Sequence, residues 1–396
     1  MRMPIVPKRL LLNLALVPAS LLLLLVASEL FFRFVLPAPD MPEPSFSDAV
    51  LRHRPGQRGV FWLRDEFRCR FAINAQGFNS ARPDYPQERT GLPRLCLVGD
   101  SYVEALQTDP GQSLAEDLER EFGGRLEVFR FGVSGAPLSQ YLHMARRAAL
   151  PCRPDILAVL LVHNDFHESY EDTPGLYTRS FLKLRLGPGT VQEIPPEPYR
   201  RGVLHVLRSA SATWRYLALG LRVDFNWLRA LLAPHKPQAK EAPAAPVHQA
   251  NIDVSRIPAR EARDRQATAY LFDRLRSEAA AAGARPLLVM DGVRLPIERR
   301  SPDAMDANSG ALRLNRMAAE EAGRLGIPFL DLHPVFAEDF ARHGKPFAFP
   351  HDGHWNAYAH GVAARAVAAR LRDLGWLPAP APDPGPHGPA LRGGDS

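Results

Sequence analysis

Short apolar runs alternate with helical patterns along most of the chain, and this alternation constrains the fold more than any other feature. Residues 94–99 form a short, continuous apolar run that ends in Gly, as buried parallel strands do, and further strands are predicted at residues 126–131, 156–162, 285–290 and 327–332. Helical spacing follows them at residues 112–122, 138–150, 262–282, 311–325 and 357–374. Repeated strand–helix alternation predicts an α/β fold with a parallel sheet covered by helices on both faces. Because ligands bind beyond the carboxyl ends of such strands, we expect the chemically active residues to follow strands directly.

The N-terminal segment has the pattern of a membrane anchor. Basic residues at positions 2, 8 and 9 precede an apolar stretch at residues 10–36, whose centre from Leu14 to Ala27 carries no charge. This predicts a transmembrane signal anchor at 10–36, a cytoplasmic N-terminus at 1–9 and a catalytic domain across the membrane. A cleaved signal peptide is the alternative, because Val26-Ala27-Ser28 offers the small residues that cleavage needs. The apolar stretch continues through Phe32, which favours an uncleaved anchor.

Composition shifts divide the rest of the chain. Residues 37–93 begin with a Pro-rich, semi-rigid spacer and continue as a segment that flanks the fold. The α/β alternation fills residues 94–376, with an insertion near 170–260. Within this insertion, the Pro- and Ala-rich stretch at 234–250 predicts an exposed excursion. The Pro- and Gly-rich residues 377–396 predict a disordered tail.

Charge and cysteine content limit the classes of function. The net charge is +6 and the pI is near 9.4, but the basic residues are scattered, which argues against nucleic acid as a partner and suits an anionic lipid surface. The cysteines at 69, 96 and 152 form no CxxC pair, so a structural zinc site is not indicated. Cys96 lies in an apolar run and is typical of a buried thiol. A disulfide between Cys69 and Cys152 stays open.

Three strand ends carry groups suited to acyl chemistry. The first ends in Gly99-Asp100-Ser101, which places a hydroxyl at a strand-to-helix turn, although Asp100 or Ser101 could simply cap that helix. The second ends in Gly132-Val-Ser-Gly135, whose glycines let a backbone amide approach a substrate oxygen, as an ordinary glycine turn also would. The third is followed by Asn164, whose side-chain amide is a second donor for an oxyanion or a common turn residue.

The segment 350–356, PHDGHWN, offers a base. A serine needs a neighbouring group to take its proton, and His354 is suited to that task. Asp352 could orient the imidazole and stabilise the imidazolium. A metal site made of His351, Asp352 and His354 is the alternative interpretation of this segment.

Taken together, the order Ser, Gly, Asn and His resembles the SGNH/GDSL hydrolase superfamily. The stretch Ile73–Phe78 with Glu29 and Arg33 looks like the bacterial branch that has a single N-terminal membrane anchor. The resemblance implies a three-layer α/β/α, flavodoxin-like fold, no metal or organic cofactor, and a bacterial inner-membrane protein with a periplasmic catalytic domain. It implies Ser101 as nucleophile and His354 as base, and we expect Asp352, two residues before His354, to be the acid. The oxyanion donors would be the Ser101 and Gly135 amides and the Asn164 side chain.

Two departures from the family pattern affect the expected activity. Val162 stands where the family usually has glycine, and the acid lies two residues before His354 instead of three. The Asp352-Gly-His354-Trp355 order resembles SGNH-like acetyltransferases of exopolysaccharide modification. We expect an esterase that acts through an acyl-serine on an acylated envelope glycan or lipid. A polysaccharide O-acyltransferase and a non-catalytic scaffold are the alternatives.

Aromatic residues in the insertion add one open question about the substrate. Trp214, Tyr216, Phe225 and Trp227 could face a lipid or a sugar, although their helical spacing is more typical of packing residues.

Overall fold

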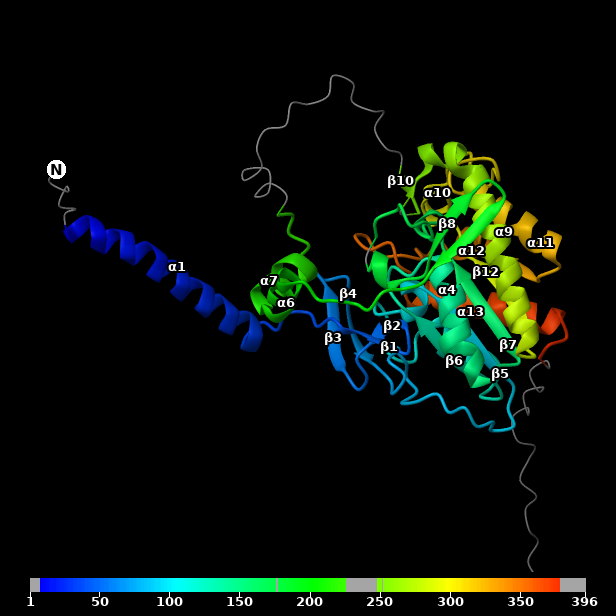
Figure 1. The fold of residues 1–396 in the computed structure, drawn as a ribbon, viewed down its shortest axis with the longest axis horizontal. Helices are drawn as coiled ribbons and strands as arrows, with labels where there is room; N and C mark the ends of the chain where they lie inside the picture. Colours follow the sequence, from blue (N-terminus) through cyan, green and yellow to red (C-terminus); the bar gives the residue numbers. More distant parts are fainter. Residues whose placement is uncertain (1–7, 176, 226–247, 251, 378–396) are drawn as a thin grey trace, which may run out of the picture.

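A parallel sheet forms the centre of the protein. The computed structural model describes residues 8–175, 177–225, 248–250 and 252–377. In this part of the chain, a five-stranded sheet has the order β13-β12-β7-β5-β6, and all its neighbours are parallel (Figure 1). The strands are β5 (Arg94–Gly99), β6 (Glu127–Gly132), β7 (Ile156–Leu161), β12 (Arg285–Met290) and β13 (Phe329–Asp331). Every residue of β5, β6 and β7 is buried, which explains the continuous apolar sequence of β7 and the apolar run Leu95–Val98 in β5.

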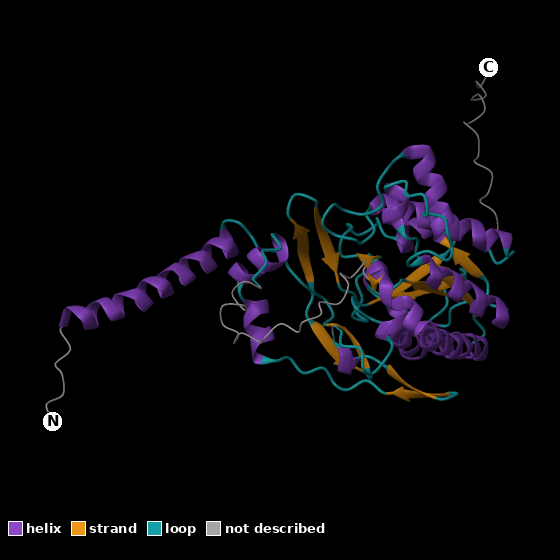
Figure 2. Cartoon of the chain, turned by 90° about the horizontal axis from the view of Figure 1, so that it is seen from above, coloured by secondary structure: helices purple, strands orange, loops and turns teal. Residues whose placement is uncertain are grey.

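Helices cover both faces of this sheet, so the predicted three-layer α/β/α class is confirmed (Figure 2). Alternate strand residues point to opposite faces. Cys96 and Val98 pack in one apolar core with α4 (Leu138–Met144), α9 (Ile257–Ala281) and α11 (Leu312–Leu325). Leu95 and Leu97 pack in the other core with α3 (Leu114–Glu121), α12 (Leu332–His343) and α13 (Ala357–Asp373).

Some predicted element boundaries differ from the structure. The helix expected at 138–150 is α4 followed by a π-helical turn, Ala145–Ala149, and a 3₁₀ turn, Leu150–Cys152. The strand expected at 327–332 is only β13, because Leu332 already begins α12, which the sequence analysis did not predict. The side chain of Asp331 accepts a hydrogen bond from the amide of His333 at 2.9 Å and so caps α12.

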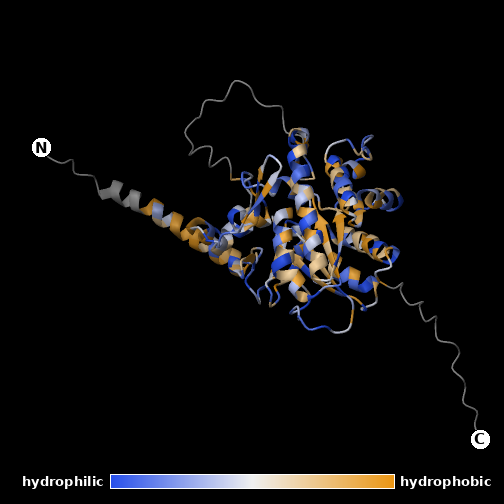
Figure 3. Cartoon of the chain, turned by 45° about the vertical axis from the view of Figure 1, so that its right-hand side comes forward, coloured by the Kyte–Doolittle hydropathy of each residue, from blue (hydrophilic) through white to orange (hydrophobic). Residues whose placement is uncertain are grey.

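The apolar N-terminal segment forms the long helix α1 (Lys8–Phe34), which projects away from the sheet (Figures 1 and 3). Its residues Leu16–Phe34 are long and apolar enough to cross a membrane, a property that signal sequences share. Two antiparallel hairpins follow α1. They are β1 (Pro44–Ser47) with β2 (Val50–His53), and β3 (Arg58–Leu63) with β4 (Phe67–Ala72). The Pro-rich stretch before β1 is packed, since Ala38 is buried and the indole of Trp62 donates to the carbonyl of Pro37.

The insertion returns the chain to the end of α1. It contains the hairpin β8 (Lys183–Gly187) and β9 (Thr190–Ile194), the helices α6 (Val203–Ala210) and α7 (Ala212–Trp214), and the π-helix η4 (Arg215–Gly220). The short pair β10 (His248–Gln249) and β11 (Ile252–Asp253) precedes α9. Most of the excursion expected at 234–250 lies outside the described residues, as do Trp227, residues 1–7 of the expected cytoplasmic N-terminus and residues 378–396 of the expected tail.

The cysteines are unpaired. Cys69, Cys96 and Cys152 are all buried free thiols, so the disulfide considered between Cys69 and Cys152 is not formed, and the expectation of a buried Cys96 is confirmed.

Candidate active site

The structure brings together Ser101, His354 and Asp352 at the carboxyl edge of the sheet. Ser101 is the first residue of α2 (Ser101–Glu104), directly after β5, and His354 lies on the loop before α13. The Oγ of Ser101 lies 2.8 Å from Nε2 of His354. On the other side of the ring, Nδ1 of His354 contacts Oδ1 of Asp352, which also accepts the backbone amide of His354 at 2.9 Å. This arrangement can transfer the hydroxyl proton to the imidazole.

Asp100 is the residue that caps α2. Its Oδ1 accepts the backbone amide of Tyr102 at 2.9 Å, and its Oδ2 lies 3.3 Å from the Oγ of Ser101. Asp100 is 2% exposed, and this burial raises the pKa of its carboxyl to about 7. Since Asp100 supplies the cap, the hydroxyl of Ser101 is left to face His354.

The carboxylate of Asp352 is held in its ionised form. Burial by itself would raise its pKa, but the hydrogen bonds and charge of His354 and the charge of Arg222 outweigh that effect, and the pKa is lowered. Arg222, from the insertion, donates to Oδ2 of Asp352 at 2.7 Å and also contacts the carbonyl of His351. An ionised carboxylate on Nδ1 fixes the imidazole tautomer and stabilises the imidazolium.

His351 belongs to a different contact. Its Nδ1 lies 2.5 Å from Oε1 of Glu66, and its backbone amide donates to Oε2 of the same carboxylate at 3.0 Å. Within the ranges that the structure describes, no group of three or more His, Cys, Asp or Glu side chains is arranged to hold a metal ion. The metal interpretation of residues 351–354 therefore has no geometric support.

Two glycines bring the Gly132–Gly135 turn up to the serine. A Cβ on Gly132 would lie 2.1 Å from the backbone nitrogen of Glu104, so only glycine lets β6 approach α2 this closely. Gly135 has φ of +75°, a conformation that glycine adopts without strain. Among the described residues, the backbone amides of Ser101 and Gly135 have no hydrogen-bond acceptor, which suits both for a substrate oxygen.

The carboxylate of Glu104 holds the Gly132–Gly135 turn in place. It accepts the backbone amide of Ser134 at 2.9 Å, contacts the hydroxyl of Ser134, and pairs with His53 of β2. Burial would raise the pKa of Glu104, but the charge and hydrogen bond of His53 and the bonds from Ser134 lower it. An N-terminal hairpin thereby helps to shape the expected oxyanion site.

Asn164 lies at the end of β7 with its amide turned toward Glu168. The Nδ2 of Asn164 donates to Oε2 of Glu168 at 3.2 Å, which leaves one of its two N–H groups for another acceptor. Val162, at the position where the family usually has glycine, is 2% exposed and packs in the apolar core that contains α13. Its side chain is therefore part of this core.

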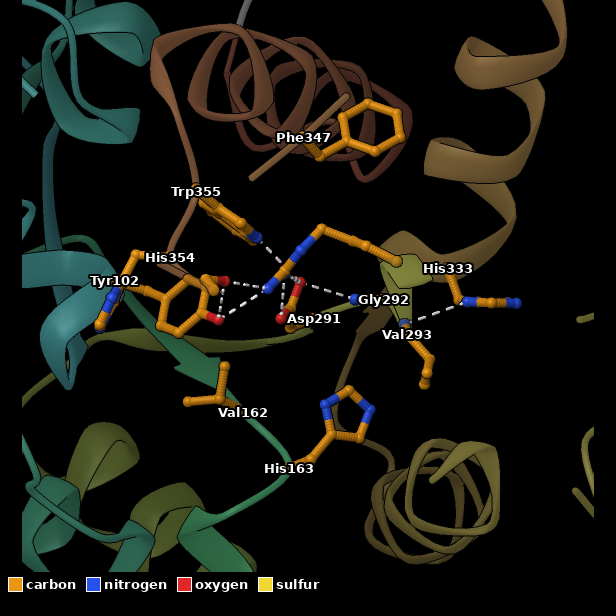
Figure 4. Close-up of polar contacts among 12 residues, drawn as sticks. Tyr102, Val162, His163, Asp291, Gly292, Val293, His333, Phe347, His354 and Trp355 are labelled. Carbon is orange, nitrogen blue, oxygen red and sulfur yellow. Dashed lines mark hydrogen bonds and ion pairs between the residues drawn. The ribbon is translucent and has the colours of Figure 1, made fainter. Parts of the chain in front are cut away.

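A buried ion pair supports the histidine loop, as Figure 4 shows. Asp291 follows β12 directly and contacts the guanidinium of Arg294 at 2.5 and 2.7 Å. Arg294 also donates to the hydroxyl of Tyr102 and to the carbonyl of Gly353, both at 2.7 Å, and Trp355 donates to Asp291 at 2.9 Å. Because Gly353 and Trp355 flank the histidine, the ion pair holds the loop on both sides of it.

Sequence reasoning missed the supporting residues Asp291, Glu104 and Arg222. Asp291 follows a strand, so the rule that active residues follow strands could have found it. Glu104 lies three residues after Ser101 in an otherwise apolar stretch, which is a weaker signal. Arg222 lies in the insertion, far from every motif, and no local pattern marks it.

Comparison with known proteins identifies the family. Residues 97–362, well over half of the chain, match the GDSL-like Lipase/Acylhydrolase family. No curated protein matches the chain.

Solved structures of esterases are also similar. One is a lipase/acylhydrolase from Enterococcus faecalis, with 10% identity, a TM-score of 0.37, and coverage of 72% of this chain and 97% of that one. Another is a catalytic mutant of an acetylxylan esterase from Geobacillus stearothermophilus, with 15% identity, a TM-score of 0.38, and coverage of 74% and 98%. A third is a two-domain esterase active on acetylated mannans, with 11% identity, a TM-score of 0.38, and coverage of 74% and 53%. On the strength of the family match, this chain belongs to the GDSL-like lipase/acylhydrolase family and is an ester hydrolase of the SGNH type.

Proposed function

We propose that the protein is a serine esterase that acts outside the cytoplasm, through an acyl-Ser101 intermediate, on an acyl group carried by an envelope glycan or lipid. The contact chain from the Oγ of Ser101 through His354 to Asp352 is the observation that supports this proposal most directly. The apolar helix α1 supports the location, because a helix of this length can anchor the domain to a membrane.

The reaction follows from these contacts. His354 takes the proton of Ser101 as the hydroxyl oxygen attacks the ester carbonyl. The amides of Ser101 and Gly135 and the free N–H of Asn164 stabilise the resulting oxyanion, and loss of one such donor costs roughly a hundredfold or more in rate. Collapse breaks the ester C–O bond, and His354 gives its proton to the leaving alcohol. Water, activated by His354, then cleaves the acyl-serine.

An O-acyltransferase is the second candidate, favoured by the Asp352-Gly-His354-Trp355 order. The chemistry of the first half-reaction is the same, and a sugar hydroxyl replaces water in the second. Trp355 itself is 1% exposed and bonded to Asp291, so its contribution is to hold the loop. A non-catalytic scaffold would have no need for the contact between Ser101 and His354.

The test is the intact mass of the full-length protein in detergent after incubation with p-nitrophenyl acetate. We expect ester turnover and an acetyl adduct on Ser101 in the parent protein. Ser101→Ala should lose both, and His354→Ala should show strongly reduced turnover. Ser277→Ala, at an exposed position on α9, is the matched control and should behave as the parent protein. A folded protein with neither turnover nor adduct would contradict the esterase proposal. Acetyl transfer to an added oligosaccharide, in place of hydrolysis, would favour the acyltransferase.

A further inference from the structure

Helix α6 presents an apolar face that no described part of the chain covers. Val203, Leu204, Val206 and Leu207 are 78, 58, 44 and 62% exposed, and α6 contains no buried residue. At about 100° per residue, these four side chains gather on one side of the helix, and the polar residues of α6 lie on the other. An amphipathic helix with such a face is typical of an element that lies on a membrane surface.

This face is fixed to the end of the apolar helix α1. The carboxylate of Glu29 accepts the backbone amides of Ala212 and Thr213 at 2.9 and 3.1 Å. Arg33 donates to the carbonyl of Ala210, the last residue of α6, at 2.8 Å. Figure 1 shows α6 and α7 beside the end of α1. A bilayer spanned by α1 would therefore have its surface close to α6.

An apolar hollow lies between α1 and the segment 211–225 that follows α6. It has a volume of about 530 Å³, and its apolar lining comes from α1, from α7 and η4, and from the loop after η4: Leu25, Val26, Leu30, Trp214, Leu217 and Phe225. This lining suits a hydrocarbon chain better than a polar ligand. The guanidinium of Arg208 lies 4.8 Å from the ring centre of Trp214. A tryptophan beside an arginine is typical of the boundary between lipid headgroups and acyl chains.

We propose that the apolar face of α6 lies in the headgroup–acyl boundary of the bilayer that α1 spans, with a lipid chain in the hollow. Arg33 and Arg208 then lie at the level of the lipid phosphates. The proposal rests on the proposed function in one respect, namely that α1 is a membrane helix.

The same segment leads to the active site. After η4 the chain reaches Arg222, whose guanidinium donates to Asp352. The carbonyl of Gly220, the last residue of η4, accepts the backbone amide of Arg64, the residue directly after β3. Glu66, on the β3–β4 turn, holds His351. The surface assigned to the bilayer is thus linked to the loop that carries His354 through the contacts of Arg222 and of the β3–β4 turn. The substrate that follows from this placement is an acyl ester held at the membrane surface, on a lipid or a lipid-linked glycan.

Fluorescent probes on the full-length protein in lipid vesicles test the contact. A single cysteine is introduced as Leu207→Cys on α6, Leu22→Cys on α1, or Ala281→Cys at the end of α9, and labelled with an environment-sensitive dye. The native thiols are buried, and burial raises the pKa of Cys69 and Cys152 to about 11, so the exposed introduced thiol reacts first. Ala281 lies near the start of β12, at the sheet end opposite the active site, and serves as the control.

Brominated lipids should quench the dye at positions 207 and 22 and leave the dye at position 281 unchanged. If position 22 is quenched and position 207 is not, the α6 proposal is overturned while the anchor stands. A dye at 207 that is unquenched but reports an apolar environment would assign the face to a protein partner, which also overturns the proposal. Absence of quenching at both 22 and 207 would overturn the anchor and the α6 contact together.

Enzyme activity tests the placement of the substrate. In the variant Leu204→Glu/Leu207→Glu, two charges oppose lipid contact, so the rate on an ester lipid in vesicles, divided by the rate on p-nitrophenyl acetate, should fall about tenfold. Arg200→Glu, at an exposed position before α6, is the control for added negative charge. An unchanged ratio would overturn the membrane-held substrate.

Discussion

Arg222 adds to the stabilisation of the proposed acid in its ionised form from outside the catalytic motifs, although the hydrogen bonds and charge of His354 contribute more. Its guanidinium lies 2.7 Å from Oδ2 of Asp352 and helps to lower the pKa of that carboxyl. Arg222→Ala should reduce kcat/KM about tenfold, because a charge-assisted hydrogen bond is lost at a half-exposed position. The pKa of Asp352 should rise, and the acid limb of the profile of kcat/KM against pH should move to higher pH.

The measurement is kcat/KM for p-nitrophenyl acetate between acid and neutral pH. Arg222→Lys should recover part of the rate, and Arg200→Ala, in the same insertion, should leave the profile unchanged. An Arg222→Ala variant with the parental rate and acid limb would show that Arg222 does not act through Asp352.

Asp100 should make the folded protein less stable as the pH rises from acid to neutral. Burial raises the pKa of this carboxyl from 3.8 to about 7, so between these values the folded state binds more protons than the unfolded state. The free energy of unfolding therefore decreases as the pH rises through this window. Asp100→Asn removes the ionisation and keeps an oxygen to cap α2, so it should raise the melting temperature at pH 8 and less so at pH 5.

Thermal unfolding of the full-length protein in detergent at both pH values measures this difference. Asp373→Asn, at the exposed end of α13, should show no such pH dependence. An equal effect of Asp100→Asn at pH 5 and pH 8 would contradict the assignment.

The proposed catalytic residues could be predicted from the sequence because each follows a strand or stands in a short motif. Ser101, Asn164 and His354 are separated by tens to hundreds of residues, but the short motifs around them, taken in this order, predicted that they act together. Arg222 and Glu104 could not be assigned in this way, because their contacts with Asp352 and Ser134 depend on how distant segments pack.

At the scale of elements, the close approach of β6 to α2 is the contact on which the site depends. Gly132→Ala would place a Cβ 2.1 Å from the backbone nitrogen of Glu104, and backbone cannot rotate away as a side chain can. We expect a loss of about 1–3 kcal/mol in the free energy of unfolding, together with reduced kcat/KM, because the strand and the Ser101 helix must separate. Chemical denaturation and ester turnover measure the two effects. Gly323→Ala, in α11 with open space around it, should be neutral or slightly stabilising, and a similar result for Gly132→Ala would contradict the argument.

Element boundaries show where local patterns are insufficient. The strands β5 and β12 have the predicted bounds, because each contains a run of four buried apolar residues, Leu95–Val98 and Leu287–Met290. Helix α12 was not predicted, since only Leu332, His333 and Phe336 are buried in it and its apolar pattern is weak. The helix α12 begins after Asp331 because the side chain of Asp331 caps it. In the sequence alone, Asp331 could equally be the last residue of a strand.

At the scale of the whole molecule, the parts that the sequence separates are joined in space. The spacer, the insertion and the apolar helix have different compositions, which is why they were predicted as separate segments. In the structure, Phe32 of α1 stacks on Tyr216 of η4 with ring centres 4.2 Å apart, and Trp62 of β3 packs against the same tyrosine at 5.1 Å. These contacts link residues more than a hundred positions apart, so no local pattern could reveal them.

The same contacts lead to a prediction about the N-terminus. The small residues Val26, Ala27 and Ser28 lie inside helix α1, and Glu29 and Ser28 are bonded to the start of α7. Proteolytic cleavage favours extended and exposed segments, so we expect α1 to be retained in the mature protein. The protein, purified from bacterial membranes through a C-terminal tag, should have an intact mass that includes residues 10–36 and should stay in the membrane fraction after an alkaline wash. A new N-terminus at Glu29, directly after Val26-Ala27-Ser28, would contradict this prediction. Such cleavage would also separate the domain from the bilayer that α6 is proposed to contact.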